Sequence, residues 1–311
     1  MILTLTLSPS LDKSYIFDGM SVNGINYTKR SVLLPGSKGI NVSRMLTSLA
    51  VDNMALGFCG GYLGPLFKTL LDVENVKYDF VETEADIRFN VKLADVLNGT
   101  STDINEIATG VSEDEFESLI ELYKDYLSES EYVVIAGGTR EDMPDDVYNT
   151  FIRAARFSGK KVLLDVKGEA LRCGIEEKPY LISPNIDELS EYAGRKLESL
   201  EEIEGVLTDI HNKGVAYAIV TLGADGALMV CDDGTYKMTP PKVDVKNTTG
   251  AGDSFLAGII YGLKNGSDAV KMLKLAGSIS SVKVTKEDTA MPGIIEALSM
   301  MDTVMVEKYE S

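Results

Sequence analysis

Short apolar runs alternate with amphipathic stretches along most of the chain. The apolar runs have the length of strands, and the amphipathic stretches repeat apolar residues at the spacing of a helix. Strands are predicted at residues 2–7, 53–58, 131–136, 161–166, 179–182 and 216–221. Helices are predicted near 40–50, 64–73, 113–128, 145–157, 199–213, 251–264, 268–284 and 292–300. This alternation indicates βαβ units, so the pattern predicts an α/β fold with a mostly parallel central sheet.

Three parts of the chain depart from this alternation. A hairpin is predicted from residues 227–230 and 236–238. Residues 13–34 hold two extended segments, and residues 87–106 alternate polar and apolar positions. Both regions fit strands of a small separate sheet. No internal repeat or long linker divides the sequence, which favours a single domain over residues 1–311.

The composition supports a buried core and excludes several classes of partner. Of the 311 residues, 44% are hydrophobic and 25% are charged, which is typical of a folded protein. The net charge of −18 repels a phosphate backbone, so we expect no nucleic-acid partner. Any phosphate-binding site must then be locally basic. No apolar run reaches the roughly 18 to 20 residues that cross a bilayer, so we expect no membrane association.

The cysteines and the single histidine show no pattern of a reactive or metal-binding site. Cys59, Cys173 and Cys231 lie far apart, without the spacing of metal ligands or of a disulfide framework. Buried thiols of this kind are typical of a reducing compartment. Residues 1–7 read as a first strand rather than a signal peptide, so we expect a cytoplasmic location. His211 looks like the C-terminal residue of a helix.

The segment from Asn247 to Gly258 carries the strongest chemical signal. Gly250, Ala251 and Gly252 open an amphipathic helix. Small residues let backbone N–H groups approach a ligand, and the helix N-terminus favours an anion there. Asp253 in the same turn disfavours simple anion binding, which indicates a proton acceptor beside a phosphoryl group in transfer. The alternative is an ordinary first-turn acid, and local physics leaves both interpretations open.

Four further segments place glycine or polar residues where ligands bind in parallel sheets, each with a structural alternative. The glycine-rich turn at residues 35–44 feeds a helix and matches neither a P-loop nor a dinucleotide fingerprint. Residues 221–226 form a strand end and a tight turn. Asn185 is expected to cap a helix, with Glu188 as its capping-box partner. Asp12 follows the first strand and can accept hydrogen bonds from ligand hydroxyls or serve in a turn.

In this order, the segments resemble the PfkB (ribokinase-like) family of carbohydrate kinases over essentially the whole chain. The matching patterns are L-T-L-x-P-S-x-D, P-G-x-K-G-I-N-V-x-R, R-x-N-V-K, P-N-x-x-E-L and N-x-x-G-A-G-D-S. Within the family, Asp12 and the segments 88–92 and 100–106 look most like the 1-phosphofructokinase and tagatose-6-phosphate kinase branch. The resemblance implies a three-layer α/β/α fold with a small β-sheet lid formed by about 13–34 and 87–106.

The resemblance also implies roles at matched positions. Asp253 would be the catalytic base, and the turn formed by Gly250, Ala251 and Gly252 would stabilise the transferring phosphoryl group through backbone N–H groups. Asn185 and Glu188 would organise Mg²⁺ and the ATP phosphates, largely through water. The sugar phosphate would be held by Asp12, Gly36, Ser37, Lys38, Asn41, Arg88, Asn90 and Gly138. The nucleotide site would be lined by Thr221, Gly223, Asp225, Gly226 and Ser278.

The activity that follows is ATP-dependent phosphorylation of a ketohexose phosphate. The first candidate is fructose 1-phosphate, converted to fructose 1,6-bisphosphate, and the alternative is tagatose 6-phosphate. A non-catalytic sugar-phosphate sensor is a weaker alternative. A nicotinamide-dependent dehydrogenase is weaker still, because no glycine fingerprint follows the first strand. Exposed edges of the lid strands favour a homodimer through the lid.

The sequence departs from the family pattern at several positions near these motifs. Ser37 replaces the second glycine of G-G-K-G, and Ser183 replaces the lysine of K-P-N. Arg140 stands in a segment where relatives carry G-S-L-P-x-G, and Lys167 replaces a serine. These departures bear on substrate choice without fixing its direction, and monovalent-cation dependence also stays open.

Overall fold

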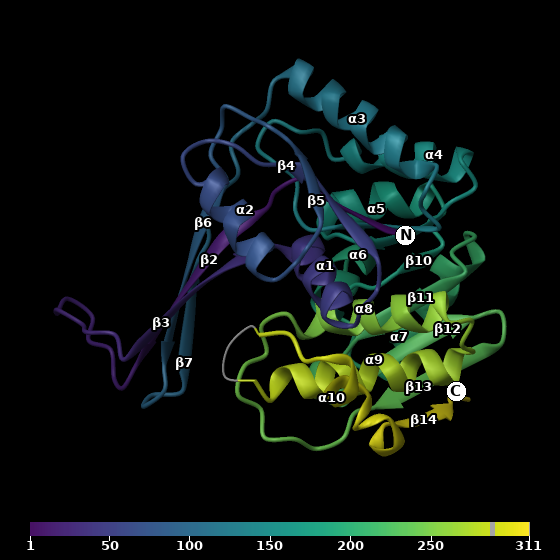
Figure 1. Ribbon diagram of the computed structural model, residues 1–311. Coiled ribbons are helices and arrows are strands. Elements are labelled where there is room, and N and C mark those ends of the chain that lie inside the picture. The colour runs from purple at the N-terminus through teal and green to yellow at the C-terminus, as the bar shows by residue number, and fades with distance from the viewer. Residues whose placement is uncertain (287–289, 311) are drawn as a thin grey trace.

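The computed structural model describes residues 1–286 and 290–310. In these ranges a ten-stranded sheet runs through the molecule (Figure 1). Its order is β14 (Met305–Lys308), β13 (Gly234–Thr239), β12 (Ala227–Cys231), β11 (Tyr217–Thr221), β10 (Leu181–Ile182), β9 (Lys161–Asp165), β8 (Tyr132–Ala136), β1 (Ile2–Thr6), β4 (Asn53–Phe58) and β5 (Tyr78–Val81). Neighbours from β5 to β11 are parallel, and β12 to β14 extend the sheet in antiparallel fashion. The parallel strands therefore end at one common edge.

Helices cover both faces of this sheet (Figure 1). On β8, Val133 and Ile135 pack into one core cluster, whereas Tyr132 and Val134 pack into another on the opposite face. The first cluster includes residues from α3 (Glu113–Leu127), α4 (Val147–Phe157), α5 (Gly168–Glu176), α6 (Ile186–Ala193) and α7 (Leu200–Asn212). The second includes residues from α1 (Lys38–Ser48), α8 (Ala251–Lys264), α9 (Ala269–Val284) and α10 (Ile294–Leu298), the last through Ala297. This arrangement confirms the three-layer α/β/α prediction.

A third cluster lies where α2 (Gly64–Val73) packs near β4 and β5. Beside it stands a four-stranded sheet, drawn in purple and blue to one side of Figure 1. Its order is β3 (Arg30–Gly36), β2 (Ser10–Phe17), β6 (Arg88–Asp95) and β7 (Thr100–Ile104). The central pair, β2 and β6, is parallel. The separate small sheet predicted from residues 13–34 and 87–106 is confirmed.

Local sequence signals account for several helix starts. Ser112, Asn185 and Ser199 each accept a hydrogen bond from the backbone three residues on, and the glutamate at that position closes a capping box. The capping box predicted for Asn185 and Glu188 is thus confirmed. Helix α8 spans 251–264, as its amphipathic pattern predicts.

The cysteines form no disulfide in the described residues, and the single histidine lies at the end of a helix. Cys59, Cys173 and Cys231 are free. His211 lies in the last turn of α7, with Nδ1 2.8 Å from the carbonyl oxygen of Val215. No helix in the part of the chain that the structure describes is long and apolar enough to cross a membrane.

Candidate active site

A cleft of about 720 Å³ is lined by residues from both sheets. It collects most of the residues that the sequence motifs single out. Those lining it are Asp12, Ser37, Lys38, Asn41, Arg88, Asn90, Gly138, Asn185, Glu188, Thr221, Gly250, Ala251, Gly252 and Asp253. They come from chain segments up to about 240 residues apart, and the common carboxyl edge of the parallel strands brings them together.

Asp253 lies in the first turn of α8 and is an acid of the cleft with a raised pKa. Its side chain is buried, and Asn41 donates a hydrogen bond from Nδ2 to Oδ2 of Asp253 at 2.7 Å. Burial, together with the nearby charge of Asp165, raises the pKa of Asp253 from 3.8 to about 6. A carboxylate with this pKa is still ionised at neutral pH yet accepts a proton readily, as a general base must.

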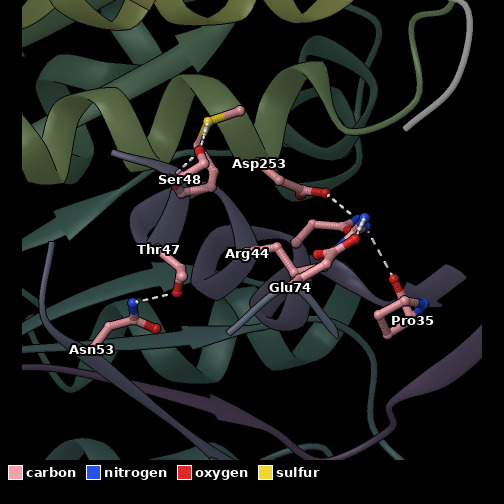
Figure 2. A network of polar contacts seen from close by, with 9 residues as sticks. Pro35, Arg44, Thr47, Ser48, Asn53, Glu74 and Asp253 are labelled. Carbon is pink, nitrogen blue, oxygen red and sulfur yellow. Dashed lines mark hydrogen bonds and ion pairs between the residues drawn. The ribbon is translucent and has the colours of Figure 1, made fainter. Parts of the chain in front are cut away.

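A buried arginine orients the amide that contacts Asp253. Arg44 Nη1 donates to Asn41 Oδ1 at 3.2 Å and to the Pro35 carbonyl at 3.1 Å. Its Nε and Nη2 donate to the two carboxylate oxygens of Glu74 at 2.5 and 2.6 Å. Figure 2 shows Arg44 between Glu74 and Pro35, close to Asp253. Because Arg44 occupies the amide oxygen of Asn41, the amide nitrogen is directed to Asp253.

The first turn of α8 provides backbone donors beside this base. Gly250 precedes the helix with φ 77 and ψ 10. The N–H of Ala251 donates to the Thr248 carbonyl at 3.1 Å, so this group is engaged within the turn. No protein acceptor for the N–H of Gly252 or Asp253 is found among the described residues. These two first-turn donors can therefore bind an anion.

Asp12 lies at the small-sheet end of the cleft. Its Oδ1 accepts from Ser10 Oγ and from Asn90 Nδ2, both at 2.9 Å, and Lys92 Nζ lies 3.7 Å from Oδ2. The parallel register of β2 and β6 pairs Asp12 with Asn90. A Cβ at Gly36 would come within 2.5 Å of the Asp12 carboxyl group, so glycine is required there. Gly36 does not line the cleft itself, but the absence of a side chain there leaves room for the Asp12 carboxyl group.

Arg88 is one of two basic residues, with Lys92, that the small sheet presents to the cleft. Its Nη2 donates to the Ser8 carbonyl at 2.9 Å, which anchors the guanidinium at the end of β1. Nε is buried and has no protein partner, and the same holds for Oδ1 of Asn90. Burial lowers the pKa of Arg88, although the charges of Asp12 and Glu106 oppose this. Buried polar atoms without a protein partner are rare, so these two atoms mark a part of the small sheet that packing alone does not explain.

Lys38 forms ion pairs with two acids that lie far from it in the sequence, which the sequence motifs do not reveal. Its Nζ lies 2.7 Å from Asp165 Oδ1 and 3.0 Å from Glu188 Oε1. Burial alone would lower the pKa of Lys38, but these two carboxylates outweigh it and raise the pKa. Lys38 was expected at the sugar and its phosphate. In the structure its ammonium group instead contacts Asp165 at the end of β9 and Glu188 in the first turn of α6.

Asn185, Glu188 and Thr221 form the neighbouring wall. Glu188 Oε2 accepts from the Asn185 backbone N–H at 3.0 Å, while its other oxygen faces Lys38. Thr221 N–H donates to the Pro184 carbonyl at 3.0 Å, which fixes the end of β11 beside the start of α6. No cluster of three or more His, Cys, Asp or Glu that could hold a metal occurs in residues 1–286 and 290–310.

Four residues expected at the nucleotide lie outside the lining of the cleft: Gly223, Asp225, Gly226 and Ser278. Gly226 packs against β13, where an added Cβ would lie 1.8 Å from the Met238 carbonyl oxygen. Ser278 is fully buried and donates to the Ala297 carbonyl at 2.5 Å. Both residues thus have packing roles in the structure, which local sequence does not distinguish from ligand contacts.

The departures from the family pattern occupy different surroundings. Lys167 and Ser183 line the cleft. Arg140 is buried outside it, where Nε donates to the Thr109 carbonyl at 2.7 Å and Nη1 to the Leu7 carbonyl at 3.2 Å. The guanidinium group of Arg140 therefore holds the backbone of the loops around β1. Ser37 lines the cleft with φ 91 and ψ 150.

Two residues of the cleft region were not singled out by the sequence. Asp165 is an acid at the carboxyl end of a parallel strand, which is the signal that could have identified it. Burial raises its pKa, and Lys38 opposes the shift. Tyr148, in α4, is fully buried, and its hydroxyl lies 3.1 and 3.0 Å from the carbonyl oxygens of Gly137 and Gly138. It holds the loop that lines the cleft, and no local pattern marks it.

The chain is similar to known proteins over nearly its whole length. The chain is 34% identical over 298 residues to 1-phosphofructokinase of Bacillus subtilis, covering 96% of this chain and 97% of that protein. It is 33% identical to 1-phosphofructokinase of Borreliella burgdorferi, covering 91% and 92%. The crystal structure of phosphofructokinase-2 from Escherichia coli in complex with potassium matches with a TM-score of 0.90 at 28% identity, covering 97% and 98%.

A second crystal structure of the Escherichia coli enzyme, in complex with fructose-6-phosphate, matches with a TM-score of 0.88 at 27% identity over the same shares. These likenesses confirm the ribokinase-like fold. The model of the pfkB family of carbohydrate kinases matches residues 9–295, which is most of the chain. The chain therefore belongs to the pfkB carbohydrate kinase family and is a sugar-phosphate kinase.

Proposed function

We propose that this kinase transfers the γ-phosphoryl group of ATP to the 6-hydroxyl of fructose 1-phosphate, giving fructose 1,6-bisphosphate. The observation that carries the proposal is the similarity to two 1-phosphofructokinases over more than nine-tenths of each chain. It favours fructose 1-phosphate over tagatose 6-phosphate. The raised pKa of Asp253 supports turnover rather than a non-catalytic sensor.

Asp253 is the proposed general base. Its carboxylate takes the proton of the attacking hydroxyl as the oxygen bonds to phosphorus and the bond to ADP breaks. The free N–H groups of Gly252 and Asp253 would stabilise the charge of the phosphoryl group in transfer. Asn41 holds the carboxylate in place through its 2.7 Å hydrogen bond.

Asp12, Asn90 and Arg88 are proposed to hold the sugar phosphate. Asp12 and the unpartnered Oδ1 of Asn90 can accept hydrogen bonds from sugar hydroxyls. The guanidinium group of Arg88, which lines the cleft, can donate to the phosphate already present. These groups supply the local positive and polar character that the acidic surface makes necessary.

ATP and Mg²⁺ are proposed to bind at the opposite wall. Asp165 and Glu188 are carboxylates that suit Mg²⁺, which proteins usually hold with one or two acids plus substrate phosphates and water. When bound, Mg²⁺ would neutralise phosphate charge. Lys38 contacts both carboxylates, and Lys167 adds a second positive charge to the same cleft. The residues present thus fit a magnesium nucleotide.

We also propose that two copies associate through the small sheet, which would act as a lid. Its strands and connecting loops expose Ile25, Tyr27, Leu97 and Ile104 at 84, 87, 74 and 55%. Apolar groups at an exposed sheet favour pairing with another surface. Free cysteines and the ATP requirement favour a cytoplasmic location.

A coupled assay of ADP release with Mg-ATP tests the proposed function. Fructose 1-phosphate, tagatose 6-phosphate, fructose 6-phosphate and fructose are compared side by side, with Asp253→Asn as the control. We expect the highest kcat/KM with fructose 1-phosphate and a loss of about 10² to 10⁴-fold in the variant. A higher kcat/KM with another sugar, or full activity in the variant, would contradict the proposal.

A further inference from the structure

Lys283 is the only lysine that is buried in the part of the chain that the structure describes, residues 1–286 and 290–310. It lies in the last turn of α9, and its side chain is 0% exposed. Taking an ammonium group out of water is unfavourable, so lysine is rarely fully buried unless its charge is compensated. A lysine on the surface would suit the end of the helix equally well. None of the roles proposed above uses this charge.

The side chain of Lys283 reaches the turn that opens α8. Helices α8 and α9 lie side by side (Figure 1). A Cβ added to Gly250 would lie 3.8 Å from Cε of Lys283 and 3.9 Å from Oδ2 of Asp253. Gly250 lines the cleft, whereas Lys283 does not. The end of the lysine side chain therefore approaches the turn from the interior of the protein and not from the cleft.

The end of α9 also holds the segment that leads into this turn. The carbonyl oxygen of Val284, next to Lys283, accepts from the N–H groups of Lys246 and Asn247 at 2.7 and 3.1 Å. The side chain of Asn247 in turn accepts from the N–H of Thr249 at 2.9 Å. These contacts fix the end of α9, and Lys283 with it, relative to the turn.

This turn is the place where the proposed reaction develops negative charge. The N–H groups of Gly252 and Asp253, which have no protein acceptor among the described residues, are the donors proposed for the phosphoryl group in transfer. Inside a protein, a fixed charge attracts a nearby anion more strongly than it would in water. Because Lys283 is fully buried, salt and water screen its charge little. The ammonium group can therefore add to the attraction that the two N–H groups exert.

We propose that Lys283 is a positioning residue for phosphoryl transfer, whose buried ammonium group supports the turn at residues 250–252 from the interior and adds its positive charge to that of the turn. The inference rests on the proposed function for the role of the turn. Since Lys283 does not line the cleft, binding of the sugar phosphate and of ATP should depend little on it. The rate of transfer should depend on it strongly, because charge reaches the turn only as the phosphoryl group moves.

Lys283→Met keeps most of the length and volume of the side chain but removes its charge. We expect kcat to fall about 10- to 100-fold, somewhat less than the loss of a donor that touches the reacting group. KM for either substrate should stay within about threefold. Lys271→Met is the matched control, because Lys271 is exposed on the same helix, and it should behave as the wild type. An unchanged kcat in Lys283→Met, or a KM that rises as much as kcat falls, would overturn the proposal.

A second variant separates charge from packing. Lys283→Ala removes a group of the size and charge of propylammonium, so added propylammonium chloride should restore kcat several-fold. Propan-1-ol has nearly the same size without the charge and should restore nothing, and tetramethylammonium chloride controls for ionic strength. Equal recovery with propylammonium and propan-1-ol would mean that the side chain only fills space, which would contradict the proposal, as would the absence of any recovery.

The proposed function is judged separately, by turnover of fructose 1-phosphate in the wild type. The role of Lys283 is also tested without turnover, by calorimetric titration with Mg-ADP in the presence and absence of fluoroaluminate, a mimic of the phosphoryl group in transfer. Lys283→Met should bind Mg-ADP as the wild type does but bind the complex with the mimic about tenfold more weakly. That result would support the role of Lys283 even if the proposed function had failed, and equal binding of the mimic would refute it.

Discussion

Asp253 is buried and shares the cleft with Asp165, and these two conditions set the pH range in which Asp253 would act as the proposed base. Since burial and the charge of Asp165 raise its pKa to about 6, the base is protonated and inactive below that value. We expect kcat/KM to fall about tenfold for each pH unit below 6. The measurement is the pH profile of kcat/KM with saturating Mg-ATP.

Sugar phosphates themselves titrate near pH 6, so a control must separate enzyme from substrate. Burial, the larger cause of the raised pKa of Asp253, stays in Asp165→Asn, but the second cause, the charge of Asp165, is removed, so the acidic limb should move part of the way to lower pH. Titration of the substrate is the same in both proteins. An acidic limb that stays in place in the variant would show that Asp253 does not cause it.

The same residue also makes stability depend on pH. Its folded-state pKa lies above the unfolded value of 3.8, so the folded state binds a proton that the unfolded state releases, and stability falls as pH rises from about 4 to 6. Above pH 6 the buried charge of Asp253 lowers the free energy of unfolding by on the order of 2 to 3 kcal/mol. Asp253→Asn removes it, so this inactive variant should melt at a higher temperature than the wild type at pH 8.

The difference between the two melting temperatures should shrink below pH 6 and vanish near pH 4. Differential scanning calorimetry across this range is the measurement. A difference that stays constant with pH would mean that the substitution acts through packing and not through the charge.

Arg44 is a positioning residue that acts on Asp253 through Asn41. Arg44→Lys keeps the charge but cannot donate to Glu74 and Asn41 together, because lysine lacks the planar fork. The Asn41 amide then loses its fixed orientation, and the hydrogen bond that lowers the pKa of Asp253 weakens. We expect kcat to fall about tenfold and the acidic limb to move to higher pH.

Arg153→Lys is the matched control for this change, because Arg153 pairs with Glu177 on the surface, 65% exposed and away from the cleft. It should leave the pH profile unaltered. If Arg44→Lys lowers kcat without moving the acidic limb, its role is structural only.

At the scale of elements, helix α6 combines a capping motif with an acid that we propose to serve Mg²⁺ and ATP. Glu188→Gln preserves the capping box, since glutamine also accepts from the Asn185 N–H, but removes the charge that faces Lys38 and the proposed metal. The melting temperature should change little, while KM for Mg-ATP should rise about tenfold. Asn185→Ala is the comparison, because it breaks the cap and should cost about 1 kcal/mol of stability.

The sequence predicts the long, strongly patterned elements well and misses the short or polar ones. Strand β5 has four residues and includes Asp79, and β14 is an edge strand in which Glu307 and Lys308 break the apolar run. Helix α5 contains two glycines, one of which packs closely on Leu164. These elements depend on tertiary packing, and the local pattern of apolar and polar residues does not predict such packing.

The same limit applies to the site. Residues within one motif, such as Asn185 and Glu188, are foreseen with their contacts, because they are three positions apart. The contacts of Lys38 with Asp165 and Glu188 span 127 and 150 positions, so only the assembled sheet reveals them. The burial of Ser278 against Ala297, 19 positions along the chain, is likewise not visible in the sequence of its own helix.

At the scale of the whole molecule, the exposed apolar side chains of the small sheet predict an oligomer. Light scattering should give about twice the monomer mass of 33.8 kDa. Replacing both Ile25 and Tyr27 by aspartate should release monomers, because burial of these charges at an interface is costly. Phe157→Asp is the control, since Phe157 is 96% exposed on α4, away from the small sheet. A monomeric wild type would contradict the proposal.

The central pair of the small sheet has a consequence for how the molecule is made. Strands β2 and β6 lie side by side, yet α1, β4, α2 and β5 of the main body come between them in the chain. The small sheet therefore cannot form during synthesis until the first part of the main body has emerged and brought the two strands into register. For the same reason the small sheet is not a transferable module. Recombination that moved either strand alone would carry only half of its central pair.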